Sequence, residues 1–137
     1  GVSNFPPDLL RTALELAPVA CNQVEYHPFL DQSELLGICR EHDVMLTAYA
    51  PVARNEVADE ETLVEIARAH GKSPAQVALR WLLQQEMVAA IPRSSNREHR
   101  EENLRIFDFE LSGEEMRRIG GLARGERLID PDFAPAW

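Results

Sequence analysis

The stretch V-M-L-T-A-Y (Val44–Tyr49) is almost continuously apolar. This pattern is typical of a parallel strand that helices cover on both faces. A helix is predicted on either side of it, over Ser33–His42 before the strand and over Glu60–His70 after it. Such alternation predicts an α/β fold, in which parallel strands are joined by crossover helices.

The same alternation continues in both directions along the chain. Strands are predicted over Val19–Tyr26 and Met87–Ile91, and Gly1–Ser3 forms the end of an earlier strand. The remaining predicted elements are helices over Pro6–Leu16, Pro74–Gln85, Arg97–Ile106 and from Ser112 to about Leu122, followed by an irregular tail over Ala123–Trp137. Three full strands and the end of a fourth make about half of an eight-stranded barrel.

Capping signals mark several helix ends. S-P-A-Q (Ser73–Gln76) combines a capping serine, a first-turn proline and a glutamine that completes a capping box. S-G-E-E (Ser112–Glu115) predicts another box, and D-Q-S-E (Asp31–Glu34) a third. Asn4 is expected to open the first helix, and Gly71 is a natural stop for the helix before it.

The composition indicates one soluble folded domain. Hydrophobic residues make up 45% and charged residues 27% of the 137 residues, which excludes a disordered chain. The net charge of −9 argues against a nucleic-acid partner, and no apolar run approaches the ~20 residues of a membrane-spanning helix. Because the chain begins with Gly1 rather than Met, we expect a fragment or a product separated from an upstream segment.

Several chemistries have no motif in this sequence. G-x-G-x-x-G, G-x-x-x-x-G-K-[ST], H-E-x-x-H and G-x-S-x-G are all absent. The histidines are scattered, so no metal site is expected. Cys21 and Cys39 are isolated, which favours free thiols in a reducing cytoplasm over a disulfide or a zinc site.

Polar residues gather where the predicted strands end. Ser3 and Asn4 follow the first strand, Gln23 lies in the second, and Tyr49 closes the third. Barrel active sites form at these carboxyl ends. Arg93–Asn96 follow the last strand and precede a helix, a place suited to binding phosphate. From these residues alone, the alternative that 94–96 merely cap the helix stays open.

Six segments in this order carry a resemblance to a known family: G-V-S-N-F (1–5), N-Q-V-E-Y-H-P (22–28), A-Y-A-P (48–51), G-K-S-P-A-Q-V-A-L-R-W (71–81), I-P-R-S-S (91–95) and E-N-L-R-I-F-D-F-E-L-S (102–112). Together they resemble the aldo-keto reductases over essentially the whole chain, beginning at the fifth of the family's strands. The resemblance implies the C-terminal half of a (β/α)8 TIM barrel. Residues 1–137 would form a partial NAD(P)(H)-dependent oxidoreductase domain, with 123–137 as its C-terminal tail.

The resemblance also implies a cofactor site for NADP(H), with NAD(H) as a second cofactor. Ser3, Asn4 and Gln23 would hydrogen-bond the nicotinamide carboxamide, and Tyr49 would stack beneath the ring. The loop 50–55 would wrap the pyrophosphate. The full implied set is Ser3, Asn4, Gln23, Tyr49, Ala50, Pro51, Val52, Arg54, Ile91, Arg93, Ser94, Ser95, Asn96, His99, Glu102 and Asn103.

At the other end of the cofactor, Arg93, Ser94 and Asn96 would hold the phosphate on the adenosine ribose. Glu102 and Asn103 would contact the adenosine itself.

Two departures from the family pattern bear on the cofactor. Ala50 and Ala53 stand where the family loop usually has serine and glycine. His99 stands where many members carry a second phosphate-clamping arginine, and a neutral imidazole binds phosphate more weakly than a guanidinium. We therefore predict weaker discrimination for NADP(H) over NAD(H). Arg100 is adjacent but lies about 100° around the helix, which makes it an uncertain substitute.

The family's proton-donating tyrosine, with its lysine, aspartate and histidine partners, lies on the first four strands and has no counterpart here. Lys72 is the only lysine, and the only tyrosines are Tyr26 and Tyr49. The resemblance thus implies the cofactor-binding portion of an enzyme that reversibly reduces small aldehydes and ketones. Catalysis would need the N-terminal half-barrel as partner.

Two alternatives stay open. One is a non-catalytic dinucleotide-binding or subunit-interaction module, and the other is a nonfunctional truncated product. Phe133 and Trp137 occupy the family's substrate-loop position, but packing onto the outer helices accounts for them equally well.

Overall fold

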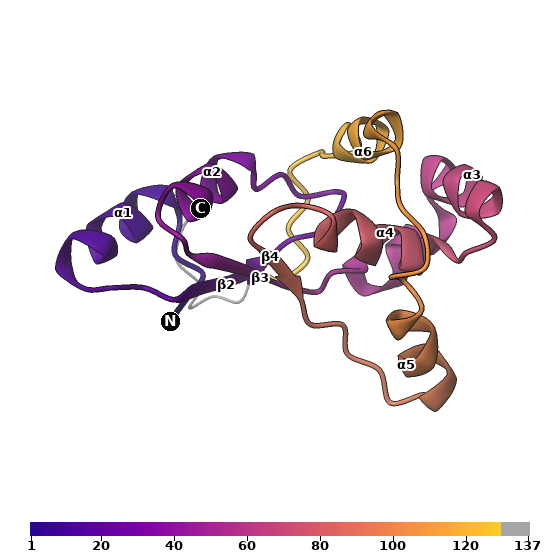
Figure 1. The fold of residues 1–137 in the computed structure, drawn as a ribbon, viewed down its shortest axis with the longest axis horizontal. Coiled ribbons are helices and arrows are strands. Elements are labelled where there is room, and N and C mark those ends of the chain that lie inside the picture. The colour runs from indigo at the N-terminus through magenta and orange to yellow at the C-terminus, as the bar shows by residue number, and fades with distance from the viewer. Residues whose placement is uncertain (130–137) are drawn as a thin grey trace.

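Four parallel strands form one sheet in the order β1-β2-β3-β4 in the computed structural model, which describes residues 1–129 (Figure 1). The strands are β1 (Val2–Ser3), β2 (Cys21–Glu25), β3 (Met45–Tyr49) and β4 (Val88–Ala90). Every neighbouring pair is parallel. The predicted succession of strands is confirmed. The expected placement of Phe133 and Trp137 lies outside the described residues.

The helices are arranged in two groups around this sheet. Figure 1 shows α1 and α2 at one end of the molecule, and α3, α4, α5 and α6 at the other. The helices are α1 (Pro7–Leu16), α2 (Ser33–Glu41), α3 (Glu61–His70), α4 (Pro74–Leu83), α5 (Arg97–Leu104) and α6 (Gly113–Gly120), with a 3₁₀ segment η1 (Ala53–Asp59). Only η1 was not predicted as a helical element.

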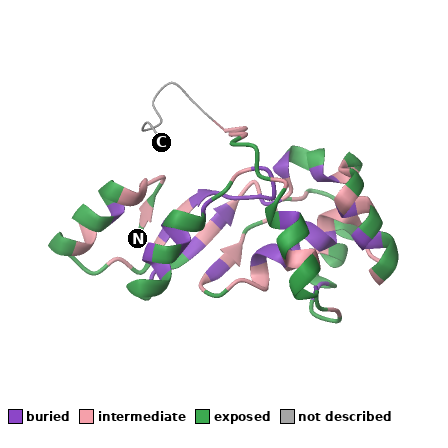
Figure 2. Ribbon diagram, turned by 90° about the horizontal axis from the view of Figure 1, so that it is seen from above, coloured by how far each residue is buried: buried purple, intermediate pink, exposed green. Residues whose placement is uncertain are grey.

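The two faces of the sheet differ in burial. In β3, Leu46 and Ala48 are buried, whereas Thr47 is partly exposed and the Met45 side of the strand faces solvent (Figure 2). The prediction that this strand is covered on both faces is therefore wrong. Successive side chains of a strand point to opposite faces, and the helices cover only one of these faces.

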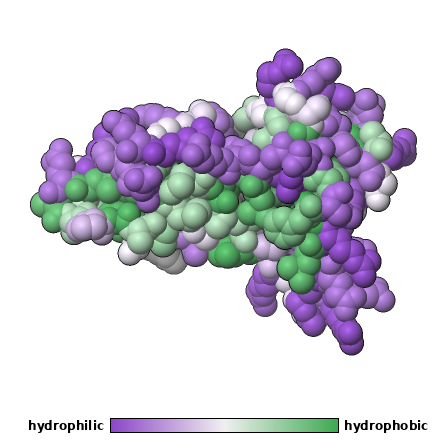
Figure 3. Space-filling view, in the orientation of Figure 1, coloured by the Kyte–Doolittle hydropathy of each residue, from purple (hydrophilic) through white to green (hydrophobic). Residues whose placement is uncertain are grey.

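The second face corresponds to the interior of a barrel that these strands do not close. In β2, Val24 is buried on the helix side while Cys21 and Gln23 are partly exposed on the other. Figure 3 shows a band of hydrophobic residues across the middle of the molecule. Large exposed hydrophobic side chains include Met45, Ile91, Leu104 and Phe107. Within residues 1–129 the sheet keeps both edge strands open.

Most capping predictions are confirmed. The Gln76 N–H donates to Ser73 Oγ at 3.2 Å, and the Ser73 N–H donates to Gln76 Oε1 at 3.0 Å. Ser112 and Glu115 form the same box at the start of α6. Gly71 ends α3 in the left-handed region at φ 63°, which a glycine adopts without strain.

Two helix starts differ from the prediction. The cap of α2 is Gln32, and no capping box forms there, because the Gln32 amide donates to the backbone oxygen of Glu25 at 2.9 Å. Asp31 instead accepts the N–H and the hydroxyl of Ser33. The cap of α1 is Pro6 rather than Asn4, since Asn4 remains in the turn after β1.

Most predicted elements extend one or more residues beyond their observed bounds, and three of them show why. The second strand begins at Cys21 rather than Val19. The fourth is limited to Val88–Ala90 because Met87 turns with a positive φ of 63°. The helix predicted to reach Ile106 ends at Leu104, where Arg105 leaves the helical region.

Tyr26 belongs to the core between β2 and α4. Its ring meets Trp81 edge-on at 5.3 Å, and its hydroxyl donates to Gln85 Oε1 at 2.8 Å. Burial raises the pKa of Tyr26 to about 12. One of the two tyrosines is thereby fixed away from the strand ends.

Candidate functional site

The first cluster of polar groups lies at the carboxyl ends of β1, β2 and β3. The Tyr49 hydroxyl donates to Asn4 Oδ1 at 3.0 Å. The backbone oxygen of Gln23 accepts both the Asn4 N–H, at 2.9 Å, and the Ser3 hydroxyl, at 3.1 Å. The structure therefore brings together Ser3, Asn4, Gln23 and Tyr49, which come from three neighbouring strands and the turn after β1.

Asn22 holds this cluster in place, and the sequence analysis did not single it out. Its side chain is fully buried, donates from Nδ2 to the Phe5 carbonyl at 2.8 Å and accepts the Phe5 N–H at 3.3 Å. These bonds fix the turn in which Asn4 adopts a positive φ of 56°. A polar side chain on the helix-facing side of a buried strand is the signal that identifies Asn22, because such a group requires hydrogen-bond partners.

Tyr49 is held as a neutral phenol. Burial and the nearby charge of Glu25 raise its pKa, while the charge and hydrogen bond of Arg127 and the hydrogen bond to Asn4 oppose this rise. With the pKa raised, the hydroxyl keeps its proton at neutral pH and remains a donor to Asn4.

The loop after β3 has an unusual backbone. Ala50, Ala53, Arg54 and Asn55 have positive φ values of 48°, 46°, 50° and 79°. Two turns close it, in which the Ala53 N–H donates to the Ala50 carbonyl and the Asn55 N–H to the Val52 carbonyl, at 2.9 and 2.8 Å. Ala53, Arg54 and Asn55 are three consecutive residues in the left-handed region, and the N–H groups of Ala53 and Asn55 are both used within the loop. The loop is thus shaped before any ligand arrives.

Replacing Arg54 with glycine is expected to raise the free energy of unfolding by about 1 kcal/mol, because a left-handed conformation strains most L-residues but not glycine. Arg54 is exposed, so the substitution removes no core packing. Asn55→Gly is the matched control and should change stability by less than about 0.5 kcal/mol, since asparagine tolerates this region. Urea unfolding of the three chains measures both values, and equal shifts would contradict the strain argument.

The second cluster lies between β4 and α5. Asn96 caps the helix, with Oδ1 accepting the Glu98 N–H at 2.8 Å, and Ser94 Oγ accepts the Asn96 N–H at 3.1 Å. The capping role considered for 94–96 is therefore present. The Arg100 guanidinium donates to the carbonyls of Ser94 and Ser95, at 3.3 and 2.9 Å, and so fixes the loop against α5.

The remaining predicted residues of this cluster are more open. Arg93 and His99 are exposed, and α5 buries none of its side chains. The carbonyl of Glu102 accepts the Gln76 amide at 2.9 Å, and Asn103 lines a shallow cavity of about 380 Å³.

Ile91 connects this cluster to the first. Its N–H donates to the Ala48 carbonyl at 3.0 Å, which places the start of the loop beside the end of β3. The 91–96 loop therefore begins next to Tyr49 in the sheet, although its own polar groups belong to the start of α5.

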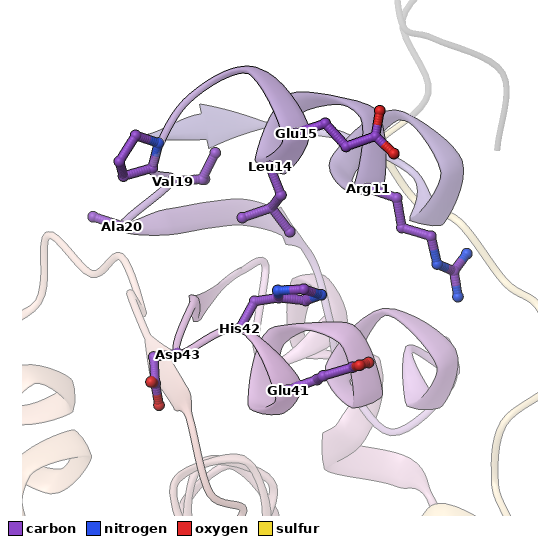
Figure 4. Close-up of a pocket in the computed structure, with 9 residues that line it drawn as sticks. Arg11, Leu14, Glu15, Val19, Ala20, Glu41, His42 and Asp43 are labelled. Carbon is purple, nitrogen blue, oxygen red and sulfur yellow. The ribbon is translucent and has the colours of Figure 1, made fainter.

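A larger cavity, of about 700 Å³, lies at the opposite end of the sheet between α1 and α2 (Figure 4). Arg11, Leu14 and Glu15 line it from α1, and Glu41 and His42 line it from the end of α2. It opens at the amino ends of β2 and β3. Barrel chemistry occurs at the carboxyl ends, so we place the candidate site there despite the size of this cavity.

Residues 1–129 were also compared with the requirements of a metal site and of a membrane-spanning helix. No group of three or more His, Cys, Asp or Glu side chains in this part of the chain could hold a metal ion. None of its helices is both long enough and apolar enough to span a membrane.

The chain matches known proteins over nearly its full length. An aldo-keto reductase of Mycobacterium avium is 45% identical over 134 residues, covering 96% of this chain and 46% of that protein. The glyoxal reductase of Bacillus subtilis is 45% identical over 132 residues, covering 93% of this chain and 47% of that protein. A crystal structure of a protein provisionally named 2,5-diketo-D-gluconic acid reductase B superposes with a TM-score of 0.96 at 43% identity, over 100% of this chain and 50% of that one.

The chain spans about half the length of the curated relatives it matches. Its open parallel sheet, with helices on one face, is the corresponding part of a (β/α)8 barrel. The sequence model of the aldo/keto reductase family matches residues 1–124. The chain belongs to the aldo/keto reductase family.

Proposed function

We propose that the chain is the cofactor-binding portion of an NAD(P)H-dependent carbonyl reductase that acts on small aldehydes and ketones. The observation that carries this proposal is the cluster at the carboxyl ends of the strands, where the Tyr49 ring is held by Asn4 beside a preshaped loop. A relative named glyoxal reductase supports a small carbonyl as substrate.

The geometry fits a dinucleotide. With Asn4 Oδ1 occupied by the Tyr49 hydroxyl, the amide presents Nδ2 as a donor for the nicotinamide carboxamide. The ring of Tyr49 offers a flat face for stacking. The loop 50–55 would lie along the pyrophosphate, and the start of α5 suits the phosphate on the adenosine ribose. The bound cofactor would supply the hydride for carbonyl reduction.

The proton for this reaction is proposed to come from residues outside the chain. Tyr26 is a core residue bonded to Gln85, and Lys72 binds Asp108 at 2.7 Å, away from the strand ends. The partner that supplies the donor would be an N-terminal half-barrel, and the same proposal places the protein in the cytoplasm with no nucleic-acid or membrane partner.

Titration of NADPH fluorescence tests this proposal. The expected result is saturable binding by the 137-residue chain, with enhancement of the nicotinamide emission. A chain that unfolds cooperatively but leaves NADPH emission unchanged at millimolar protein would contradict the cofactor role.

His99 is expected to weaken the preference for NADPH over NADH. It is exposed in the first turn of α5, and a neutral imidazole is a poor phosphate partner. His99→Arg should raise the affinity for NADPH about 10-fold, the value of one added charge-assisted hydrogen bond, and leave that for NADH unchanged. Dissociation constants for both cofactors decide this. A strong NADPH preference of the unmodified chain would contradict the prediction.

The open face of the sheet favours a second candidate function. Met45 remains exposed on this face, and Ile91 is exposed just beyond the end of β4, as on a surface that another polypeptide covers. A non-catalytic subunit-interaction module would use this face. Cofactor binding without turnover, even with a complementary half-barrel present, would favour that function over carbonyl reduction.

A further inference from the structure

Glu25 is a buried carboxylate at the carboxyl end of β2, with no part in the cofactor contacts proposed above. It is 1% exposed. Oε1 accepts His27 Nε2–H at 3.0 Å and the Leu128 N–H at 2.7 Å, and Oε2 accepts the Ile129 N–H at 3.0 Å. The two backbone donors lie 103 and 104 residues further along the chain.

The protonation of this group follows from its partners. His27 is fully buried, and its Nδ1 accepts the Phe29 N–H at 3.3 Å, so the ring proton lies on Nε2 and faces Glu25. All three contacts to Glu25 are then N–H donors, which suit an ionised carboxylate. Because a buried charge is stable only when it is compensated, Glu25 strongly favours the position of the backbone at 128–129.

That backbone belongs to the segment Arg124–Ile129, here named the C-terminal strap. The N–H groups of Arg124 and Glu126 donate to the Phe29 carbonyl at 3.1 and 3.2 Å. The Arg124 guanidinium lies 4.1 Å from the centre of the Phe29 ring. The strap therefore crosses the carboxyl end of β2 and is attached to it at both of its ends.

The strap connects Glu25 to the candidate site. Glu25 is the register partner of Tyr49 on the neighbouring strand, so the two residues of the strap that it binds lie close to Tyr49. Arg127 precedes these residues, and its charge opposes the rise of the Tyr49 pKa. The Tyr49 hydroxyl donates to Asn4. Tyr49 thus lies between the turn after β1 and the strap, and the position of the strap depends on Glu25.

We propose that Glu25 is a positioning residue: by binding the Leu128 and Ile129 N–H groups it fixes the C-terminal strap beside Tyr49, its neighbour in the sheet, and so sets the orientation of the Tyr49 ring. The consequence for cofactor affinity rests on the proposed function. The orientation of Tyr49 does not, because it can be measured without cofactor.

Glu25→Gln is the variant that tests the clamp, since it keeps the size of the side chain. An amide has only one acceptor oxygen, and its NH₂ group then faces backbone N–H groups that need acceptors. Amide hydrogen exchange of Leu128 and Ile129 is expected to become about 10-fold faster or more, as for loss of a hydrogen bond to a charged group. Unchanged exchange at both amides would overturn the proposal.

The ring signals of labelled tyrosine report the second step. The chain has two tyrosines, so Tyr26, buried against Trp81, serves as an internal reference for Tyr49. In Glu25→Gln the Tyr49 ring signals should shift while those of Tyr26 stay in place. If Glu25→Gln fails to fold, Arg127→Ala removes the side chain of the strap whose charge acts on Tyr49, and an unmoved Tyr49 signal there would overturn the proposal.

Glu115→Gln is the matched control. Glu115 also accepts a histidine, His70 at 2.8 Å, and a backbone N–H, Ser112 at 2.7 Å, but it lies on α6 away from the strand ends. This variant should leave the Tyr49 signals unchanged.

NADPH titration separates the positioning role of Glu25 from the proposed binding of the cofactor. Glu25→Gln should bind about 10-fold more weakly than the unmodified chain, whereas Glu115→Gln should bind equally well. Equal binding by Glu25→Gln would overturn the positioning role and leave the proposed function intact. Absence of binding by the unmodified chain would contradict the proposed function, and the Tyr49 ring signals would then decide the positioning role alone.

Discussion

Mixing this chain with the N-terminal half of the Mycobacterium avium relative is expected to produce NADPH-dependent reduction of small aldehydes that neither half performs alone. The chain would supply the proposed cofactor site, and the added half would supply the proton donor that the family resemblance implies and would cover the open face of the sheet. The rate should exceed that of either half by at least about 100-fold, the lower range for a positioned general acid. Loss of NADPH absorbance measures it.

The control for this experiment is the same added half with its proton-donating tyrosine changed to phenylalanine. This control should assemble with the chain and cover Met45 and Ile91 equally well, but give no increase in rate. Reduction by the chain alone at the rate of the mixture would show that it contains its own proton donor. Assembly without turnover in both mixtures would favour the subunit-interaction function.

Tyr49→Ala is expected to weaken NADPH binding by about 5- to 150-fold, because stacking of a base on an aromatic side chain is worth about 1–3 kcal/mol. Tyr49 is only partly buried and is the last residue of β3, so removal of its ring opens no cavity in the core. Fluorescence titration at equal fractions of folded protein measures the loss.

Tyr49→Phe separates the ring from its hydroxyl. It keeps the stacking face but removes the hydrogen bond to Asn4, so about 10-fold weaker binding is expected. A Phe variant that binds as weakly as the Ala variant would show that orientation, rather than stacking area, dominates. An Ala variant that binds like the unmodified chain would remove Tyr49 from the site.

Local signals allowed the fold to be predicted wherever the determining contacts are close in sequence. The box at Ser73 and Gln76 closes over three residues, and its geometry is as predicted. The Asp31–Glu34 box is wrong because the Gln32 amide binds the carbonyl of Glu25, seven residues earlier. A four-residue pattern cannot show that a side chain inside it binds a group further away in the sequence.

The site was predictable to a lesser extent. Family segments identified Asn4 and Tyr49, and their hydrogen bond places them together. Nothing near Arg100 in the sequence indicates that it braces the carbonyls of Ser94 and Ser95. The Glu25 clamp is harder still, because its donors are backbone groups that carry no residue-type signature.

The clamp on Glu25 has a consequence for proteolysis. Chain ends are usually the part of a domain that exopeptidases shorten without effect. Here, removal of the residues after Ala123 would take away two of the three donors of a fully enclosed anion. Removing these surface residues would then destabilise the interior, because it leaves the buried Glu25 with unpaired charge. Resistance of the C-terminal segment to digestion should therefore depend on Glu25 in β2.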